Sequence, residues 1–208
     1  MEGMLATWYA KNTAKSLAEF QACAKRIATR LQPHDRVLEI APGPGYLAIE
    51  LAKLGPFRVT GVDISRSFVR MAAENAARAG VMVDFREGDA AALPFADESF
   101  DFAFCRAAFK NFSNPVGALC EMRRVLRPQG MGLIIDLRND ASDEALDAAV
   151  DEMHLGRINA FVTKAIFKRS LRKRAYSRED FAQMVAATRF GSCDITEGPI
   201  GFDIWLTK

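Results

Sequence analysis

The sequence predicts an α/β fold: a doubly wound, mixed, seven-stranded sheet that ends in a β-hairpin, with a helical insertion over its carboxyl edge. Short β-branched or aromatic runs alternate with longer segments of helical periodicity, which is typical of a parallel sheet covered on both faces. Only residues 197–201 separate the last two strands, so this connection permits a hairpin but not a right-handed parallel crossover. We therefore expect five parallel strands and one reversed strand.

The strands are expected, in chain order, at residues 36–40, 58–62, 82–86, 100–105, 132–137, 191–196 and 202–207. Helices are expected at residues 13–31, 45–54, 66–79, 115–126 and 178–188. Ser65 can cap the helix that follows it, Gly80 can end that helix in a left-handed conformation, and Ser177 precedes acids that suit a helix N-terminus.

Length and composition predict a single domain over residues 1–208, since half of the residues are hydrophobic. Residues 1–31 would form an N-terminal helical cover, and residues 139–176 a helical insertion or lid. A charged fraction of 26% with a net charge of +2 argues against an acidic disordered chain and a globally basic nucleic-acid binder.

Cysteine spacing and the N-terminal residues bear on compartment. The four cysteines show no CxxC or CxxH spacing, so neither a disulfide framework nor a structural metal site is expected. The first residues lack a basic segment followed by an apolar run, and no stretch approaches the roughly 20 apolar residues of a membrane helix. We expect a cytoplasmic protein with no membrane segment and no metal.

A glycine-rich turn joins the first expected strand to the next helix, in the sequence VLEIAPGPGY (residues 37–46). Asp63 ends the following strand, where its carboxylate can accept hydrogen bonds from both ribose hydroxyls of an adenosine-containing ligand. Strand, turn, helix and acid together predict a nucleoside site; closing a corner for packing reasons is the alternative role of the glycines.

The prolines of this turn bear on which nucleoside it binds. A dinucleotide pyrophosphate is held by backbone N–H donors, and Pro42 and Pro44 have none. The turn therefore favours a ligand without phosphate, such as S-adenosylmethionine. Glu39 could then face the cationic amino group of the methionine portion; its alternative is a hydrogen bond to the loop.

Several motifs together resemble class I S-adenosylmethionine-dependent methyltransferases, of the small kind similar to ubiquinone/menaquinone C-methyltransferases. The matching segments are EIAPGPG (39–45), GVDIS (61–65), EGDAAALPF (87–95), SFDFAFC (99–105) and LRPQGMG (126–132). They span about half the chain, and the resemblance implies a Rossmann-like fold. Ala41 stands where many relatives have glycine, so we expect this position to avoid a positive φ.

The segment after the third strand is suited to an adenine pocket. Asp89 can accept from the exocyclic amine, Ile64 and Leu93 can sandwich the ring, and Ala90 leaves room for it. Turn capping by Asp89 and core packing by Leu93 are the alternatives. Together with the resemblance, these arguments assign the cofactor to Glu39, Ala41, Gly43, Gly45, Asp63, Ile64, Gly88, Asp89, Ala90, Leu93 and Cys105.

The resemblance implies methyl transfer by in-line displacement on an activated carbon, so the protein mainly positions the reactants and excludes water. The fourth strand lacks the Asn/Asp-Pro-Pro-aromatic run of methyltransferases that act on base amines, and no Pro-Cys pair follows it. A small-molecule acceptor is therefore favoured over nucleic acid. Its nucleophilic atom and the oligomeric state are left open.

Residues for the acceptor are candidates only. Arg106, with Lys110 and Asn111, could contact polar groups of the acceptor, and Trp8 and Tyr9 could fold over the cofactor as a lid. A solvated loop and a hydrophobic anchor are the respective alternatives. Candidates for direct action on the acceptor are Tyr9, Arg106, His154 and Tyr176.

Two other functions fit parts of the sequence. An NAD(P)-dependent oxidoreductase would use residues 43–48 as a GxGxxA fingerprint with Asp63 as its ribose acid, although the two prolines argue against it. A non-catalytic adenosyl-ligand-binding protein is the second alternative.

The segment 157–178 holds eight positive charges and no acid, against a whole-chain net charge of +2. Its apolar residues recur at helical spacing, so one face is expected to pack while Lys164, Lys168 and Arg172 line another. This second face is either a solvated cationic surface or a cover that attracts an anionic acceptor.

Overall fold

A computed structural model describes residues 17–153 and 155–208, which form one seven-stranded sheet in the order β3-β2-β1-β4-β5-β7-β6. The strands are β1 (Arg36–Ile40), β2 (Arg58–Asp63), β3 (Asp84–Glu87), β4 (Phe100–Arg106), β5 (Leu126–Leu137), β6 (Ser192–Glu197) and β7 (Gly201–Thr207). β7 pairs antiparallel with both β5 and β6, and the other neighbouring pairs among β1 to β5 are parallel. The predicted mixed sheet and its terminal hairpin are confirmed.

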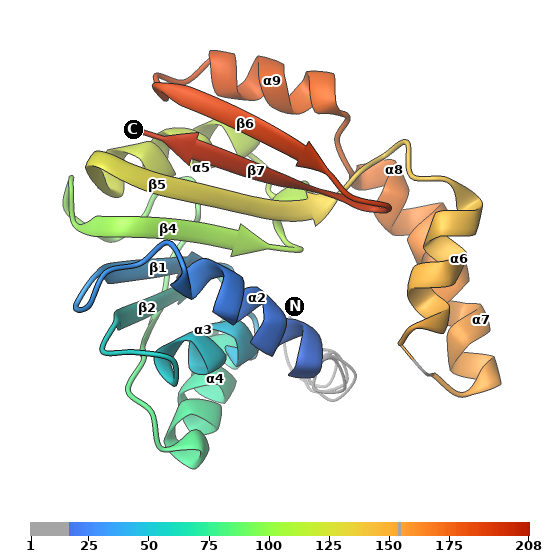
Figure 1. Cartoon of the computed structure of the whole chain (residues 1–208), viewed down its shortest axis with the longest axis horizontal. Helices are drawn as coiled ribbons and strands as arrows, with labels where there is room; N and C mark the ends of the chain where they lie inside the picture. The colour runs from blue at the N-terminus through green and yellow to red at the C-terminus, as the bar shows by residue number, and fades with distance from the viewer. Residues whose placement is uncertain (1–16, 154) are drawn as a thin grey trace.

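Helices cover both faces of this sheet, as Figure 1 shows. On one face lie α2 (Leu17–Ala28), α3 (Tyr46–Ala52) and α4 (Arg66–Ala79); on the other lie α5 (Pro115–Val125) and α9 (Arg178–Ala186). The two-residue period of β4 supplies both cores. Phe102 and Phe104 pack with the apolar residues of α2 and α3, whereas Ala103 and Cys105 pack with those of α5 and α9.

Three helix-end predictions are confirmed. The Ser65 hydroxyl accepts from the Phe68 amide at the start of α4, and Gly80 ends that helix with φ 68°. Ser177 and Asp180 form a reciprocal capping box at the start of α9. These local signals define the beginning of both helices and the end of one.

Two strand boundaries differ from the prediction by more than one residue. β3 begins at Asp84, and Met82, expected inside it, is 93% exposed beyond its pairing with β2. β5 begins at Leu126, where a turn was expected, because Leu126 already pairs with Phe100 of β4. The register of this pairing then shifts between Phe100 and Phe102. Gln129, with φ 65°, accommodates this bulge within the strand.

The insertion between β5 and α9 contains α6 (Asp143–Asp151), α7 (Arg157–Ile166), a π-helical turn η3 (Phe167–Leu171) and α8 (Arg172–Arg174). Figure 1 shows these helices beyond the carboxyl end of β5. Two helical units were expected here; α7, η3 and α8 form the second as one continuous run. None of the helices within residues 17–153 and 155–208 is long and apolar enough to cross a bilayer.

The prediction of which side of this run packs was wrong. Lys164 pairs with Asp151 at 2.8 Å, Lys168 with Asp147 at 2.9 Å, and Arg172 with Asp143 at 2.7 Å. The three cations recur every four residues, and so do the three acids. They pair in opposite chain order, so the ion pairs form an antiparallel ladder. The cationic side therefore faces α6, and the apolar side, with Phe161 76% exposed, faces solvent.

Candidate active site

The glycine turn between β1 and α3 is built from left-handed residues. Gly43 has φ 55° and Gly45 has φ 81°. A Cβ on Gly45 would lie 2.8 Å from the Cβ of Ala72 on α4 and 2.7 Å from the Phe85 ring. Both the backbone angle and the close packing of α3 therefore require glycine at position 45.

Ala41 contradicts the expectation that this position avoids a positive φ, because its φ is 58°. Its amide donates to the Val62 carbonyl at 2.7 Å, which draws the end of β1 toward β2 and holds the turn in place. A left-handed L-residue costs roughly 1–2 kcal/mol, so the surrounding fold maintains strain here.

Asp63 organises the turn from the end of β2. One carboxylate oxygen accepts from the Gly43 amide at 3.0 Å and the other from the Ser65 amide at 2.9 Å. The side chain is buried, and it joins the glycine turn to the start of α4. Contact between Asp63 and a ribose stays a prediction.

Glu39 is a buried carboxyl group at the centre of the site. Burial raises its pKa to about 8; the negative charge of Asp63 raises it further, while the Ala48 amide and Arg106 oppose the shift. Its Oε2 atom has no hydrogen-bond partner among the described residues. Such an atom is costly unless a ligand completes its bonding.

A small cavity of about 60 Å³ lies beside Glu39, between the glycine turn and the end of β4. Its walls are Phe20, Glu39, Ala41, Pro42, Gly43, Pro44, Tyr46, Arg106, Ala107 and Ala108. The carboxyl group of Glu39, with its unpartnered oxygen, and the guanidinium of Arg106 thus share one cavity. The larger cavity, lined by residues such as Asp35 and Gly130, lies at the opposite edge of the sheet.

Arg106 ends β4 and is one of the predicted candidates that the structure brings to this cavity. Its guanidinium lies 4.8 Å from the centroid of the Phe20 ring and donates to Glu19 at 3.0 Å, both on α2. These contacts hold a cation opposite Glu39. The sequence did not indicate that α2 would supply its partners.

Lys110 was expected in an exposed loop that could contact the acceptor, but the structure buries it. Its ammonium lies 2.7 Å from an Asp136 carboxylate oxygen and 2.7 Å from the Ala107 carbonyl, and its side chain is 5% exposed. Asp136 also accepts from the amides of Lys110 and Leu137. The buried pair fastens the loop after β4 to β5, and with it Ala107, whose φ is 59°.

The adenine segment follows β3. Ile64 is 69% exposed at the end of β2, and Ala90 is partly buried. Asp89 is exposed, and one of its oxygens accepts from the Ala91 amide, so it caps a turn. Leu93 lies in the core at 5% exposure. Of the two side chains expected to sandwich the ring, only Ile64 is open to solvent.

Gly88 connects this segment to β2, since its amide donates to the Asp63 carbonyl at 3.0 Å. A Cβ at this position would lie 2.8 Å from a Val62 methyl group. The close approach explains why glycine follows β3.

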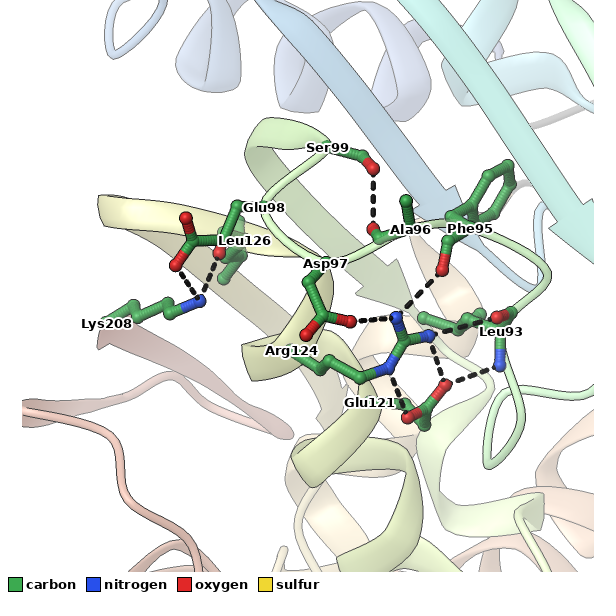
Figure 2. A network of polar contacts seen from close by, with 10 residues as sticks. All are labelled: Leu93, Phe95, Ala96, Asp97, Glu98, Ser99, Glu121, Arg124, Leu126 and Lys208. Carbon is green, nitrogen blue, oxygen red and sulfur yellow. Dashed lines mark hydrogen bonds and ion pairs between the residues drawn. The ribbon is translucent and has the colours of Figure 1, made fainter.

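A pair of helical side chains that sequence analysis missed holds the end of the adenine segment (Figure 2). Arg124 on α5 donates to the carbonyls of Leu93 and Phe95, at 3.1 and 2.8 Å, and to Asp97 at 2.7 Å. Glu121 binds Arg124 through both oxygens and accepts from the Leu93 amide at 2.7 Å. The three-residue spacing makes them neighbours, but nothing local identifies the loop they bind.

Other candidates lie elsewhere. Cys105 is 1% exposed in the core, and it does not line the cavity. Tyr176 is partly buried, stacks edge-on with Phe109 and Phe181, and has its pKa raised by burial. Tyr9 and His154 lie outside the described residues.

Within the described part of the chain, no cluster of three or more His, Cys, Asp or Glu residues could hold a metal ion.

Comparison with known proteins assigns the class. The family described as "Methyltransferase domain" matches residues 38–134. A demethylmenaquinone methyltransferase of Mycobacterium bovis is 34% identical over 167 residues, 79% of this chain and 68% of the relative. One from Deinococcus radiodurans is 36% identical over 133 residues, 62% of this chain and 54% of the relative. The chain belongs to the S-adenosylmethionine-dependent methyltransferase family.

Solved structures agree on the fold. An S-adenosylmethionine-dependent methyltransferase from Aquifex aeolicus superposes with a TM-score of 0.66 at 19% identity, covering 88% of each chain. A Methanococcus maripaludis structure described as a candidate enzyme of this class gives a TM-score of 0.79 at 24% identity, covering 98% of this chain and 91% of that one. The oxidoreductase alternative is not favoured. The chain spans about half the length of the Deinococcus relative.

The cavity residues fit the cofactor of this family. The unpartnered Glu39 oxygen suits the cationic amino group of S-adenosylmethionine, and the Arg106 guanidinium in the same cavity has the charge that would complement its carboxylate. The prolines of the turn offer no amide donors to a phosphate. Exposed Ile64 provides an apolar surface on which adenine can stack.

Proposed function

We propose that this protein transfers a methyl group from S-adenosylmethionine to a small-molecule acceptor by in-line displacement. When bound, the cofactor supplies a carbon already activated by a positively charged sulfur, so the chain need not activate it. The task of the protein is to hold donor and acceptor in line and to keep water away.

The observation that carries this proposal is the unpartnered Oε2 atom of buried Glu39 beside Arg106. A carboxyl group and a guanidinium in one small cavity complement the amino and carboxylate groups at the zwitterionic end of an amino acid. A dinucleotide has no such end, and its pyrophosphate would instead need the amides that Pro42 and Pro44 lack. The cavity therefore favours an amino-acid-bearing nucleoside.

We further propose that the acceptor carries an aromatic or quinone-type ring. The similar proteins of Mycobacterium and Deinococcus are named demethylmenaquinone methyltransferases. In this chain, partly buried Phe112 and Tyr176 both stack on Phe109 beyond the carboxyl end of β4. A tyrosine phenol is protonated at neutral pH, and burial raises the pKa of Tyr176 further, so its hydroxyl can donate a hydrogen bond to a ring oxygen.

A cytoplasmic location is part of the proposal. All four cysteines are free thiols, and Cys120 and Cys193 are exposed. Free exposed thiols suit a reducing compartment.

The decisive first experiment is a thermal-shift comparison of S-adenosylmethionine, S-adenosylhomocysteine, NAD and NADP with the whole chain. Binding to the native state alone should stabilise it by about 2.7 kcal/mol at a hundredfold excess over the dissociation constant. We expect shifts with the two adenosyl ligands and none with the dinucleotides. A shift with NAD or NADP alone would overturn the proposal.

The acceptor is tested separately, by transfer of labelled methyl groups to short-chain demethylated quinols and to a non-aromatic alcohol. Labelling of the quinols alone supports the proposed acceptor class. Cofactor binding without labelling of any ring acceptor would contradict that class while leaving the cofactor assignment intact.

A further inference from the structure

The continuous helical run α7–η3–α8 differs in charge pairing between its two sides. Toward α6, Lys164, Lys168 and Arg172 are paired with acids. Away from α6, Phe161, Val162 and Ile166 are 76%, 45% and 40% exposed. These are three of the seven large apolar side chains that the described residues expose, gathered on one helix.

Two exposed cations lie in the same helical run. Arg169 follows Val162, and Lys173 follows Ile166, by seven residues each, and both intervals cross the π-helical turn η3. Both are exposed, and neither has an ion pair with any described residue. We call Phe161, Val162, Ile166, Arg169 and Lys173 the α7 surface.

We propose that the α7 surface docks onto an anionic lipid bilayer. An apolar set flanked by unpaired Lys and Arg is the composition of a helix that lies in the interface, with its apolar groups below the headgroups. Arg169 and Lys173 have long side chains that can reach lipid phosphates while their stems stay in the apolar layer. Residues 157–174 contain no Asp or Glu, so no acid of this run opposes the contact.

A second copy of the chain is a poorer occupant of this surface. In a two-fold interface the same patch lies on both copies, so Arg169 and Lys173 would meet only apolar or cationic residues of the α7 surface on the other copy, and no acid. Charge complementarity therefore favours an anionic partner over self-association, and the mixed apolar and cationic composition favours a lipid surface.

The test is co-sedimentation of the full chain with vesicles of phosphatidylcholine alone and of phosphatidylcholine mixed with phosphatidylglycerol. We expect binding to the mixed vesicles that weakens as salt is added, and little binding to the neutral ones. The double variant Arg169→Gln, Lys173→Gln should lose roughly thirtyfold in affinity, from about 1 kcal/mol per cation near an anionic surface. Phe161→Ser should lose on the order of tenfold.

Matched controls use exposed residues outside the α7 surface. Lys25→Gln with Arg58→Gln makes the same change in charge, and Met82→Ser removes an apolar side chain that is 93% exposed. Both should leave vesicle binding unchanged. Affinity for S-adenosylhomocysteine should be the same in every variant, so failure of this proposal is distinct from failure of the cofactor assignment.

Three outcomes would overturn the proposal. Wild-type protein that binds neutral and anionic vesicles equally, or neither, contradicts it. Control variants that lose as much binding as the α7 variants show a nonspecific effect of charge. A dimer in sedimentation velocity that Phe161→Ser dissociates would identify a second copy as the occupant.

Discussion

The ammonium of Lys110 lies 2.7 Å from an Asp136 carboxylate oxygen, and their side chains are 5% and 1% exposed. This pair joins the loop after β4 to the end of β5. The same ammonium donates to the carbonyl of Ala107, the residue that follows Arg106. The geometry of the cavity therefore depends on an ion pair whose residues do not line it.

Lys110→Met should lower the free energy of unfolding by about 3–5 kcal/mol, because it leaves the Asp136 charge buried and unpaired. Denaturant titration measures the loss. Arg66→Met is the control, since its pair with Glu87 is exposed and should contribute at most about 1 kcal/mol. Adding Asp136→Leu to Lys110→Met should recover part of the loss; a still larger loss in the double variant would contradict the pairing.

Ala41→Gly should stabilise the protein, by up to about 1 kcal/mol, because relief of a left-handed alanine outweighs the greater entropy of unfolded glycine. The same substitution at Ala77, exposed within α4, should destabilise by about 0.8–1.0 kcal/mol. Thermal and denaturant unfolding of both variants compare the signs. Destabilisation at both positions would show that φ at Ala41 is not positive in solution.

Glu39 should make stability depend on pH. Its pKa is raised from 4.5 in the unfolded chain to about 8 in the folded one, so the folded state binds more protons between these values. Its contribution is therefore fully present below pH 4.5 and is lost as pH rises through about 8, with a slope near 1.4 kcal/mol per pH unit. Unfolding of wild type and Glu39→Gln across this range should differ by that slope; parallel profiles would remove Glu39 as its source.

Affinity for S-adenosylhomocysteine should show the opposite trend. A cationic amino group favours the ionised carboxylate, so binding releases a proton below about pH 8 and strengthens up to about tenfold per pH unit. Calorimetry in buffers of different ionisation enthalpy measures the proton directly. Glu39→Gln should bind more weakly at pH 8 and release none, and proton release that persists in this variant would assign it to another group.

Arg124→Ala should weaken the adenine segment, since it strands the Phe95 carbonyl and removes one donor group from the Leu93 carbonyl and the Glu121 carboxylate (Figure 2). Stranded groups of this kind cost about 1–3 kcal/mol each in stability, and affinity for S-adenosylhomocysteine should fall as well. Arg123→Ala, whose guanidinium contacts the Arg189 carbonyl, is the neighbouring control. Equal affinities in the two variants would show that the Arg124 contacts do not position the site.

The sequence predicts those features that depend on local backbone chemistry. Ser65 and Gly80 delimit α4 because capping and left-handed glycine act within a few residues. The alternation of short strand-like runs with helical segments likewise predicts a sheet with helices on both faces (Figure 1). The resemblance also predicted the family that the comparisons support.

Features that depend on distant partners were missed or wrong. Lys110 looked like a loop cation because its partner, Asp136, lies on another strand. Lys164 and Lys168 were expected to be either solvated or free to attract an anionic acceptor, because α6, which supplies their acids in antiparallel order, lies earlier in the chain. Ala41 was expected to avoid the conformation it adopts, since tertiary contacts of β1 with β2 override its own preference.

The position of β7 constrains the order in which the sheet can assemble. β7 follows β6 along the chain, yet it lies between β5 and β6 and pairs with both. Until residues 201–207 are in place, β5 presents an unpaired edge carrying buried Leu133 and Ile134, and β6 has no strand beside it. Such an edge is a template for pairing with other chains, so a partly folded protein is prone to aggregate until the hairpin closes.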